Sequence, residues 1–285
     1  MKKILLFGAT GMAGHIVYSY FKESRQYDIV NAVYRQKLND ESIIVDVKND
    51  AAVKALVLEQ KPDVIINCIG ILIKGSQAYP DNAIYINAYF PHFLKRMADE
   101  VGAKLIHIST DCVFTGNKGA YTEEDFKDAD DVYGRSKALG EINNDKDLTI
   151  RTSIIGPELK IEGEGLFHWF MNQSGNVNGF LNAIWGGVTT LELAKALDTA
   201  IKSDLKGLVH LSNGMGINKY DLLVLFKKTF NRNDITIVPF EGKKLDKSIA
   251  KSKLFSYEVP TYETMITEMF DWMTEHPEFY AEKYP

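Results

Sequence analysis

Cysteine is scarce in this sequence of 285 residues: Cys68 and Cys112 are the only two, and both lie in apolar stretches typical of strands. A disulfide framework is therefore not expected, and reduced thiols in the cytoplasm are the default. Long apolar runs are absent too. No stretch approaches the ~20 residues needed to cross a bilayer, and the apolar start of the chain ends at Gly8, too early for a signal peptide. We expect a cytoplasmic protein without a membrane partner.

An excess of positive charge is also missing. Lys and Arg number 33 against 38 Asp and Glu, a formal net charge of -5, which argues against nucleic-acid binding. The six histidines are scattered without metal-ligand spacing, so no metal is expected. The acidic run 123–131 is interpreted as a solvated loop. What remains is the composition of an ordinary enzyme, long enough for one large or two smaller domains.

The first positive signal is a glycine turn. An apolar strand from Ile4 to Phe7 leads into Gly8-Ala9-Thr10-Gly11-Met12-Ala13-Gly14, and a helix is expected to follow to about Glu23. Glycines at this spacing let the backbone turn tightly, a pyrophosphate approach, and the helix pack on the strand. Between a strand and a helix, the pattern predicts dinucleotide binding. The expected contacts are Gly8, Thr10, Gly11, Met12 and Gly14.

The residues after the second strand bear on the choice of cofactor. The expected strand 28–33 is followed by Tyr34-Arg35-Gln36, without the acidic residue that usually binds the ribose 2′-hydroxyl of NAD. Arg35 is suited to a 2′-phosphate, although an exposed surface arginine is the alternative. We therefore expect NADPH, with NADH as a possible substitute. The ends of two later strands complete the predicted cofactor site. They contribute Asp46 and Val47 after strand 43–45, and Cys68 and Gly70 in strand 64–70. For Asp46, a solvated side chain without a cofactor contact is an equally good interpretation.

The stretch 105–137 carries groups for proton transfer. An apolar strand that starts at Leu105 ends in Ser109-Thr110-Asp111, and Tyr133 and Lys137 are spaced to share one helix face. An ammonium so close should lower the pKa of the tyrosine below its usual ~10. A hydroxyl from Thr110 could then hold a carbonyl or alcohol beside the phenol. Such an apparatus requires a hydride donor or acceptor.

Strands alternate with helices over residues 1–157, which predicts an α/β fold with a doubly wound parallel sheet of the Rossmann type. Helices are expected at 50–60 and from near Pro80 to about Val101. Asn87, unfavourable inside a helix, either has a partner in the site or is exposed. We assign residues 1–157 to a dinucleotide-binding domain and residues 158–285 mainly to a smaller C-terminal α/β substrate lobe, with about 187–212 returning to the Rossmann domain.

In the C-terminal half, glycine-rich loops at 162–165 and 174–179 flank a group of aromatic residues. Trp169 and Trp185 are expected to contact the substrate, with core packing as the alternative for most aromatics here. Thr189 and Glu192 form a capping box that predicts a helix to about Ile201. Further elements are expected at 208–211, from Asn218, at 235–238 and at 261–275.

The glycine turn, Ser109-Thr110-Asp111 and Tyr133-x-x-x-Lys137, in this order, resemble the extended short-chain dehydrogenase/reductase superfamily. More closely, residues 109–116, 131–137, 151–153 and 245–248 resemble the dTDP-4-dehydrorhamnose reductase family and its relatives that act on UDP-linked 4-keto-6-deoxy sugars. The similarity covers nearly the whole chain. It specifies the superfamily better than the sugar.

The resemblance implies catalysis by Thr110, Tyr133 and Lys137, with further substrate contacts from Asp111 and Cys112. It implies NAD(P)H-dependent reduction of the 4-keto group of a UDP- or dTDP-linked 4-keto-6-deoxy sugar for polysaccharide synthesis, and it allows a homodimer. Where similar dehydratases have Asp and Glu after the catalytic Thr, this chain has Asp111 and Cys112, which favours reduction.

Two alternatives stay open. The GDP-fucose synthases have a cysteine at the same place as Cys112, so an epimerase, or a combined epimerase and reductase, is one alternative, with His168 as a conceivable partner. The other is a non-catalytic regulatory subunit that keeps the nucleotide pocket, as is known within this family. The intact set of Thr110, Tyr133 and Lys137 weighs against it.

Overall fold

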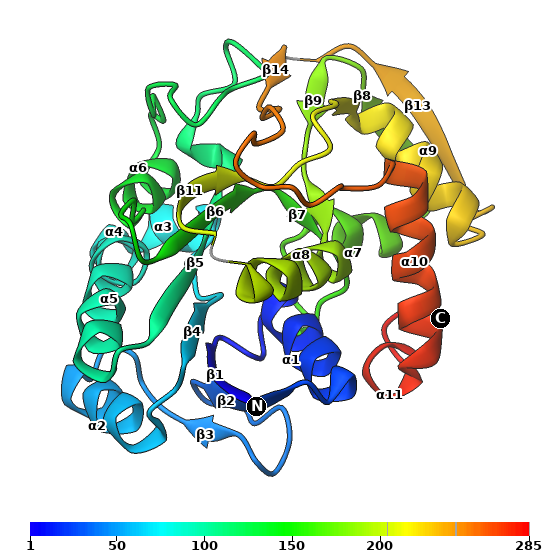
Figure 1. Cartoon of the computed structure of the whole chain (residues 1–285). Coiled ribbons are helices and arrows are strands. Elements are labelled where there is room, and N and C mark those ends of the chain that lie inside the picture. Colours follow the sequence, from blue (N-terminus) through cyan, green and yellow to red (C-terminus); the bar gives the residue numbers. More distant parts are fainter. Residues whose placement is uncertain (204, 243, 285) are drawn as a thin grey trace.

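The computed structural model describes residues 1–203, 205–242 and 244–284. Its centre is a seven-stranded parallel sheet in the order β11-β6-β5-β4-β1-β2-β3 (Figure 1). The order reverses between β1 and β4, which creates the crevice where ligands of such sheets bind. This confirms the predicted Rossmann fold. The strands are β1 (Lys2–Phe7), β2 (Tyr27–Val33), β3 (Ile43–Ile44), β4 (Val64–Asn67), β5 (Lys104–Thr110), β6 (Leu148–Thr152) and β11 (Gly207–His210).

Helices cover both faces of the sheet, which explains why residues Ile4–Phe7 of β1 form a continuous apolar run. Ile4 and Leu6 belong to the core that includes α1 (Met12–Ser24) and α8 (Thr190–Lys202). Leu5 and Phe7, pointing the other way, join α2 (Asp50–Gln60) and α5 (Phe90–Val101). All four side chains are fully buried. A strand buried on both faces reads as a continuous apolar run.

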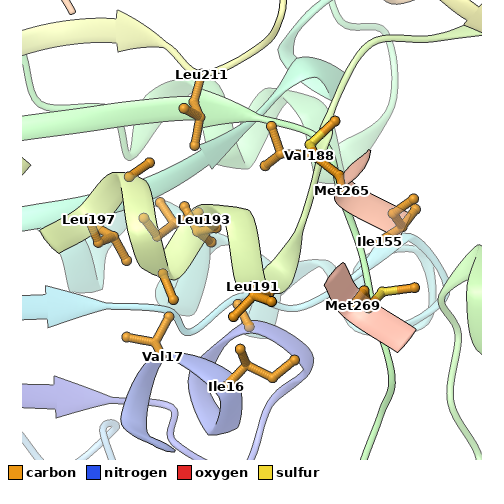
Figure 2. Close-up of a cluster of buried hydrophobic side chains, with 14 of the residues drawn as sticks. Ile16, Val17, Ile155, Val188, Leu191, Leu193, Leu197, Leu211, Met265 and Met269 are labelled. Atoms are coloured by element: carbon orange, nitrogen blue, oxygen red, sulfur yellow. The ribbon is translucent and has the colours of Figure 1, made fainter. Parts of the chain in front are cut away.

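The larger core is formed around α8 (Figure 2). Leu193 and Leu197 of α8 are fully buried in it, as are Ile16 and Val17 of α1. Helix α10 (Tyr262–Glu275) adds Met269 from the C-terminal end of the chain. Residues distant in the sequence thus share one core, which packs on one face of the main sheet.

The capping box at the start of α8 is half formed. Thr189 accepts a hydrogen bond from the backbone N–H of Glu192 at 3.2 Å, as predicted. The carboxylate of Glu192 is instead bonded by the hydroxyl of Tyr257 at 2.6 Å. Burial of Glu192 next to a tyrosine from a later segment therefore overrides the local bond that the motif predicts.

The predicted helix from Pro80 to Val101 is confirmed as one continuous helical segment, but its middle is not α-helical, since a π-helix (Ile84–Tyr89) joins α4 (Pro80–Ala83) to α5. Asn87 lies in the wider π-helical turn and is fully buried. Its side chain bonds both backbone groups of Ile71, and Nδ2 also donates to Ser136 Oγ at 3.1 Å. The amide thus links three segments near the crevice, and π-turns are frequent at functional sites.

The C-terminal half adds small sheets and helices beyond the carboxyl edge of the main sheet (Figure 1). Parallel strands β8 and β13 form one pair, β12, β9 and β14 form a second sheet, and β7 pairs with β10. None of the helices described is long and apolar enough to span a membrane. The bounds are β7 (Ile154–Ile155), α7 (Leu166–Met171), β8 (Gly175–Phe180), β9 (Ala183–Trp185), β10 (Val188–Thr189), β12 (Ile217–Asn218), α9 (Lys219–Thr229), β13 (Ile235–Phe240), β14 (Leu245–Asp246) and α11 (Pro277–Tyr280). Helix α3 (Ile73–Ala78), which precedes α4, was not predicted.

Candidate active site

The glycine turn has the geometry of an anion cradle. Gly8 has φ of 89°, a left-handed conformation that favours glycine. A Cβ on Gly14 would lie 2.1 Å from the carbonyl oxygen of Gly8, so only glycine lets α1 pack this closely on the turn. No side chain among the described residues caps α1 at Gly11, and the first N–H groups of the helix remain available. These features fit the pyrophosphate of a dinucleotide.

A cavity of about 450 Å³ extends along the carboxyl edge of the sheet from this turn. Met12 and Gly14 are absent from its described lining, and Gly14 instead provides the packing just described. The lining includes residues that sequence reasoning missed, among them Lys48, Asn82 and Lys160. The predicted cofactor residues that do line the cavity are Gly8, Thr10, Gly11, Arg35, Asp46, Val47, Cys68 and Gly70.

Arg35 is exposed and lies against the ring of Tyr34, with its guanidinium carbon 4.6 Å from the ring centroid. Its Nη2 donates to the Tyr34 hydroxyl at 3.2 Å. The side chain is thus both a surface arginine and part of the cavity wall. Stacking on an aromatic ring orders the guanidinium without neutralising its charge.

Tyr133 reaches the edge of the sheet through a close helix contact. It lies on α6 (Val132–Leu139), whose N-cap Asp131 accepts a hydrogen bond from the N–H of Gly134 at 2.8 Å. A Cβ on Gly134 would lie 2.2 Å from the carbonyl oxygen of Cys112, so glycine allows α6 to pack against the short helix Asp111–Val113. Tyr133 and Thr110 are hydrogen-bonded through their side chains. The structure therefore brings these two hydroxyls together.

The expectation that Lys137 lowers the pKa of Tyr133 is wrong in this structure. Burial raises the pKa of Tyr133, the proximity of Cys112 adds to the rise, and the hydrogen bond with Thr110 only partly opposes it. Lys137 is turned toward β5, where its ammonium donates to the carbonyl of Ile108 at 2.7 Å. Burial lowers the pKa of Lys137 to about 8, against the opposing effects of Glu141 and Cys68. The phenol is therefore protonated at neutral pH.

The hydroxyl of Thr110 is oriented by its neighbours. It donates to Asp111 Oδ1 and accepts from the N–H of Cys112, both at 3.1 Å. Burial raises the pKa of Asp111, although the charge of Lys247 opposes the rise. Burial and the charge of Asp111 raise the pKa of the Cys112 thiol to about 12, and burial raises that of Cys68 to about 12. Neither cysteine has the lowered pKa of a reactive thiol.

The aromatic residues expected at the substrate are in different settings. Trp169 on α7 is 40% exposed. Trp185 is buried in the core, where its Nε1 donates to Ser153 Oγ at 2.9 Å. The ring nitrogens of His168 lie 2.8 Å from the Tyr284 hydroxyl and 3.1 Å from the carbonyl of Ile161. Those bonds occupy His168 and do not support it as a partner of Cys112 in epimerisation.

His107 is a further residue at the site that sequence reasoning missed. Its Nε2 lies 3.4 Å from Lys137 Nζ, and its Nδ1 lies 3.1 Å from the side-chain nitrogen of Asn67. Asn67 Oδ1 accepts from the N–H of Ile69, so the amide nitrogen faces the imidazole. Burial and the charge of Lys137 lower the pKa of His107 well below its usual value. A polar residue inside the apolar run of β5 was the signal in the sequence that could have identified His107.

Across the described chain, no cluster of three or more His, Cys, Asp or Glu residues could hold a metal ion.

A Rossmann sheet in which threonine, tyrosine and lysine meet at the carboxyl edge, beside a glycine cradle, is the arrangement of the extended short-chain dehydrogenases/reductases. The particular family follows from the sequence. The chain belongs to the RmlD substrate binding domain family, whose model matches residues 1–283.

Relatives of two kinds are similar to this chain. Methionine adenosyltransferase 2 subunit beta from Xenopus laevis is 28% identical over 244 residues, which are 81% of this chain and 72% of that protein. The dTDP-4-dehydrorhamnose reductase of Salmonella typhimurium is 28% identical over 250 residues, 82% of this chain and 80% of that protein. Among solved structures, a dTDP-4-dehydrorhamnose reductase from Clostridium acetobutylicum has a TM-score of 0.80 at 25% identity and covers 95% of this chain and 99% of its own. One from Bacillus anthracis, solved in complex with NADP, has the same TM-score at 23% identity, with 95% and 99% covered.

Proposed function

We propose that this protein reduces the 4-keto group of a nucleotide-linked 4-keto-6-deoxy sugar, carried on UDP or dTDP, for polysaccharide precursor synthesis. The observation that carries the proposal is the hydrogen-bonded pair Thr110 and Tyr133 with Lys137 buried behind it. Cys68 lines the cavity, and its thiol and the Lys137 ammonium each shift the pKa of the other, although Thr110, Tyr133 and Lys137 are not among the described lining residues. The similarity to dTDP-4-dehydrorhamnose reductases supports the sugar class.

The cofactor of this reaction is a nicotinamide dinucleotide, for which NADPH is preferred and NADH is a possible substitute. The cradle of Gly8, Gly11 and Gly14 fits the pyrophosphate, and Arg35 is the cation suited to a 2′-phosphate. When bound, the reduced nicotinamide supplies the hydride. The NADP complex of the similar Bacillus anthracis structure supports this choice.

Each residue of the catalytic set has a role that its environment supports. Tyr133, whose pKa is raised, donates its proton to the oxygen that becomes the alcohol. When the substrate binds, the Thr110 hydroxyl turns its single proton from Asp111 Oδ1 to the same oxygen and holds the carbonyl, while it still accepts from the N–H of Cys112. Lys137 keeps one donor on the carbonyl of Ile108, and its remaining donors are suited to the ribose of the cofactor. The sugar nucleotide is held by the lobe, where Trp169 is an exposed aromatic residue and Trp185 is buried.

The function is tested by following NADPH oxidation with UDP- and dTDP-linked 4-keto-6-deoxy sugars, each assayed with and without enzyme. We expect turnover with at least one of them and a 6-deoxy sugar as the product. NADPH binding without oxidation by any of these substrates would refute the proposed reaction.

We expect simple reduction without epimerisation, because the pKa of the Cys112 thiol is raised and His168 is bonded elsewhere. In deuterated water the product should then carry no deuterium on ring carbons 3 and 5, and Cys112→Ser should retain turnover within a few-fold. Ring deuterium that disappears in Cys112→Ser would show that the enzyme epimerises its substrate through this thiol.

A second function is favoured by a specific observation, the 28% identity to methionine adenosyltransferase 2 subunit beta. The chain would then be a non-catalytic subunit that retains the nucleotide cavity. Such a protein would bind NADPH but leave it unoxidised with every keto-sugar nucleotide, and it would form a complex with a methionine adenosyltransferase catalytic chain in gel filtration. A reductase acting alone would show the opposite pair of results.

A further inference from the structure

A second cavity, of about 230 Å³, adjoins the cofactor cavity. The two share Thr10, which follows the glycine turn, and Lys160. The second cavity is also lined by Lys37, Lys283 and a single carboxylate, Glu278. Its lining therefore carries an excess of positive charge. The volume exceeds that of a few water molecules, at ~30 Å³ each, and has room for a phosphate group.

Lys160 lies in a loop that the C-terminal segment holds in place. The N–H of Glu158 donates to the Tyr284 hydroxyl at 2.9 Å, and the ammonium of Lys283 donates to the carbonyl of Leu159. The carboxylate of Glu158 accepts from the N–H of Gly165 at 2.7 Å and closes the loop on itself. No ion pair or hydrogen bond engages the Lys160 ammonium within the described part of the chain. A fixed backbone thus presents a free cation at the junction of the two cavities.

The same segment also holds the glycine turn. His15 Nε2 lies 2.8 Å from the Tyr280 hydroxyl, and its Nδ1 lies 2.8 Å from the carbonyl oxygen of Gly11. Residues 277–284, which include α11 at the red end of the chain in Figure 1, therefore contact both walls of the junction. This double attachment ties the loop that carries Lys160 to the helix that follows the glycine turn.

We propose that the second cavity receives the 2′-phosphate of NADPH, and that Lys160 and Lys37 bind this phosphate together with Arg35. The inference rests on the proposed use of a nicotinamide cofactor and deepens it. The ribose of a dinucleotide on this fold lies near the end of β2, so its 2′-position faces the residues that follow, where Arg35 and Lys37 are found. Lys160 lines both cavities from the loop after β7, and residues 277–284 act as its positioning segment.

The test measures dissociation constants of NADPH and NADH with the intact protein, without any sugar. In Lys160→Ala, binding of NADPH should weaken roughly tenfold or more, because a charge-assisted contact is lost, whereas binding of NADH should stay within about twofold. The matched control is Lys61→Ala, since Lys61 is exposed at the end of α2, before the amino end of β4 and away from the cofactor edge. Competition by 2′,5′-ADP and by 5′-AMP measures the contribution of the 2′-phosphate alone, because only 2′,5′-ADP carries it. In Lys160→Ala, the affinity for 2′,5′-ADP should fall and the affinity for 5′-AMP should not.

Tyr284→Phe tests the positioning segment without removing a charge. It deletes the acceptor for the N–H of Glu158, so NADPH affinity should fall several-fold with NADH affinity retained. Equal losses for both cofactors in Lys160→Ala would place the lysine at the pyrophosphate and overturn the proposal, as would unchanged NADPH binding. If Lys160→Ala weakens NADPH binding selectively but the protein reduces no keto sugar, only the proposed function is refuted. If the protein is an active reductase whose NADPH affinity is unchanged in Lys160→Ala, only this inference is refuted.

Discussion

Replacement of Tyr133 by phenylalanine is expected to lower kcat by ~10²–10⁴-fold while the dissociation constant of NADPH stays nearly unchanged. The phenol is hydrogen-bonded to Thr110, and its raised pKa keeps it protonated at the pH of the reaction. Its removal deletes the proton donor for the new alcohol. The ring of Tyr133 is retained, and the close contact of Gly134 with the short helix at Cys112 is untouched, so α6 and the cofactor cavity should remain intact.

The measurement is steady-state turnover combined with a titration of NADPH, and Tyr79→Phe is the matched control because Tyr79 is 66% exposed. Lys137→Met should impair both turnover and NADPH binding, since a cofactor that loses the proposed donor to its ribose is held less tightly and less accurately for hydride transfer. The pKa of Lys137 is about 8, so NADPH affinity should fall as the pH rises through about 8 and the ammonium loses its charge. Near-normal turnover in Tyr133→Phe would assign the proton donation to another residue.

The placement of Thr110, Tyr133 and Lys137, the proposed catalytic residues, was predictable because it follows from local rules. Tyr133 and Lys137 are four residues apart on one helix, and Thr110 ends a strand at the carboxyl edge of a parallel sheet, where ligands bind. The pKa of Tyr133 was predicted in the wrong direction. The spacing places the ammonium near the phenol but says nothing of the burial of the phenol or of the carbonyl of Ile108, which takes up the ammonium.

Features made by distant segments were beyond sequence reasoning. Lys160 is in a loop without periodicity, and its position depends on Tyr284, more than a hundred residues later. The π-helix around Asn87 depends on the backbone of Ile71, which only the folded chain brings to the amide. In each case the information lies in a tertiary contact and not in the local pattern.

A buried ion pair behind the catalytic set has the largest expected effect on stability. Arg151 on β6 donates from Nε and Nη2 to the two carboxylate oxygens of Glu141, at 2.7 and 2.8 Å, and both side chains are almost fully buried. Glu141 also accepts from the hydroxyl of Ser109, the neighbour of Thr110, at 2.7 Å. The pair therefore connects the end of α6 to β5 and β6. Burial alone would raise the pKa of Glu141, but the bonds from Arg151 and Ser109 lower it below its usual value.

Arg151→Met is accordingly expected to destabilise the protein by about 3–5 kcal/mol, seen as a fall in Tm of roughly 5–15 °C, because it leaves a carboxylate buried without its main partner. Lys127→Met is the control: its ammonium is 3.1 Å from Glu141 but partly exposed, and such a pair contributes about 0–1 kcal/mol. The double variant Arg151→Met/Glu141→Leu should recover much of the loss, since apolar replacement of a whole buried pair is close to neutral.

The pH dependence of this loss follows from the sign of the pKa shift. With Arg151 present, the pKa of Glu141 is lower in the folded state than in the unfolded state, so the pair stabilises the fold above the unfolded value of ~4.3 and this contribution disappears as the pH falls through the folded pKa. Without Arg151, burial dominates and raises the pKa of Glu141 in the folded state. On acidification, Glu141 of the variant therefore binds a proton in the folded protein, and the variant regains stability. The difference in Tm between wild type and Arg151→Met should therefore be largest near neutral pH and narrow below about pH 5. A difference that is constant with pH, or an equal loss in Lys127→Met, would show that packing of the Arg151 side chain, and not its charge on Glu141, stabilises this part of the protein.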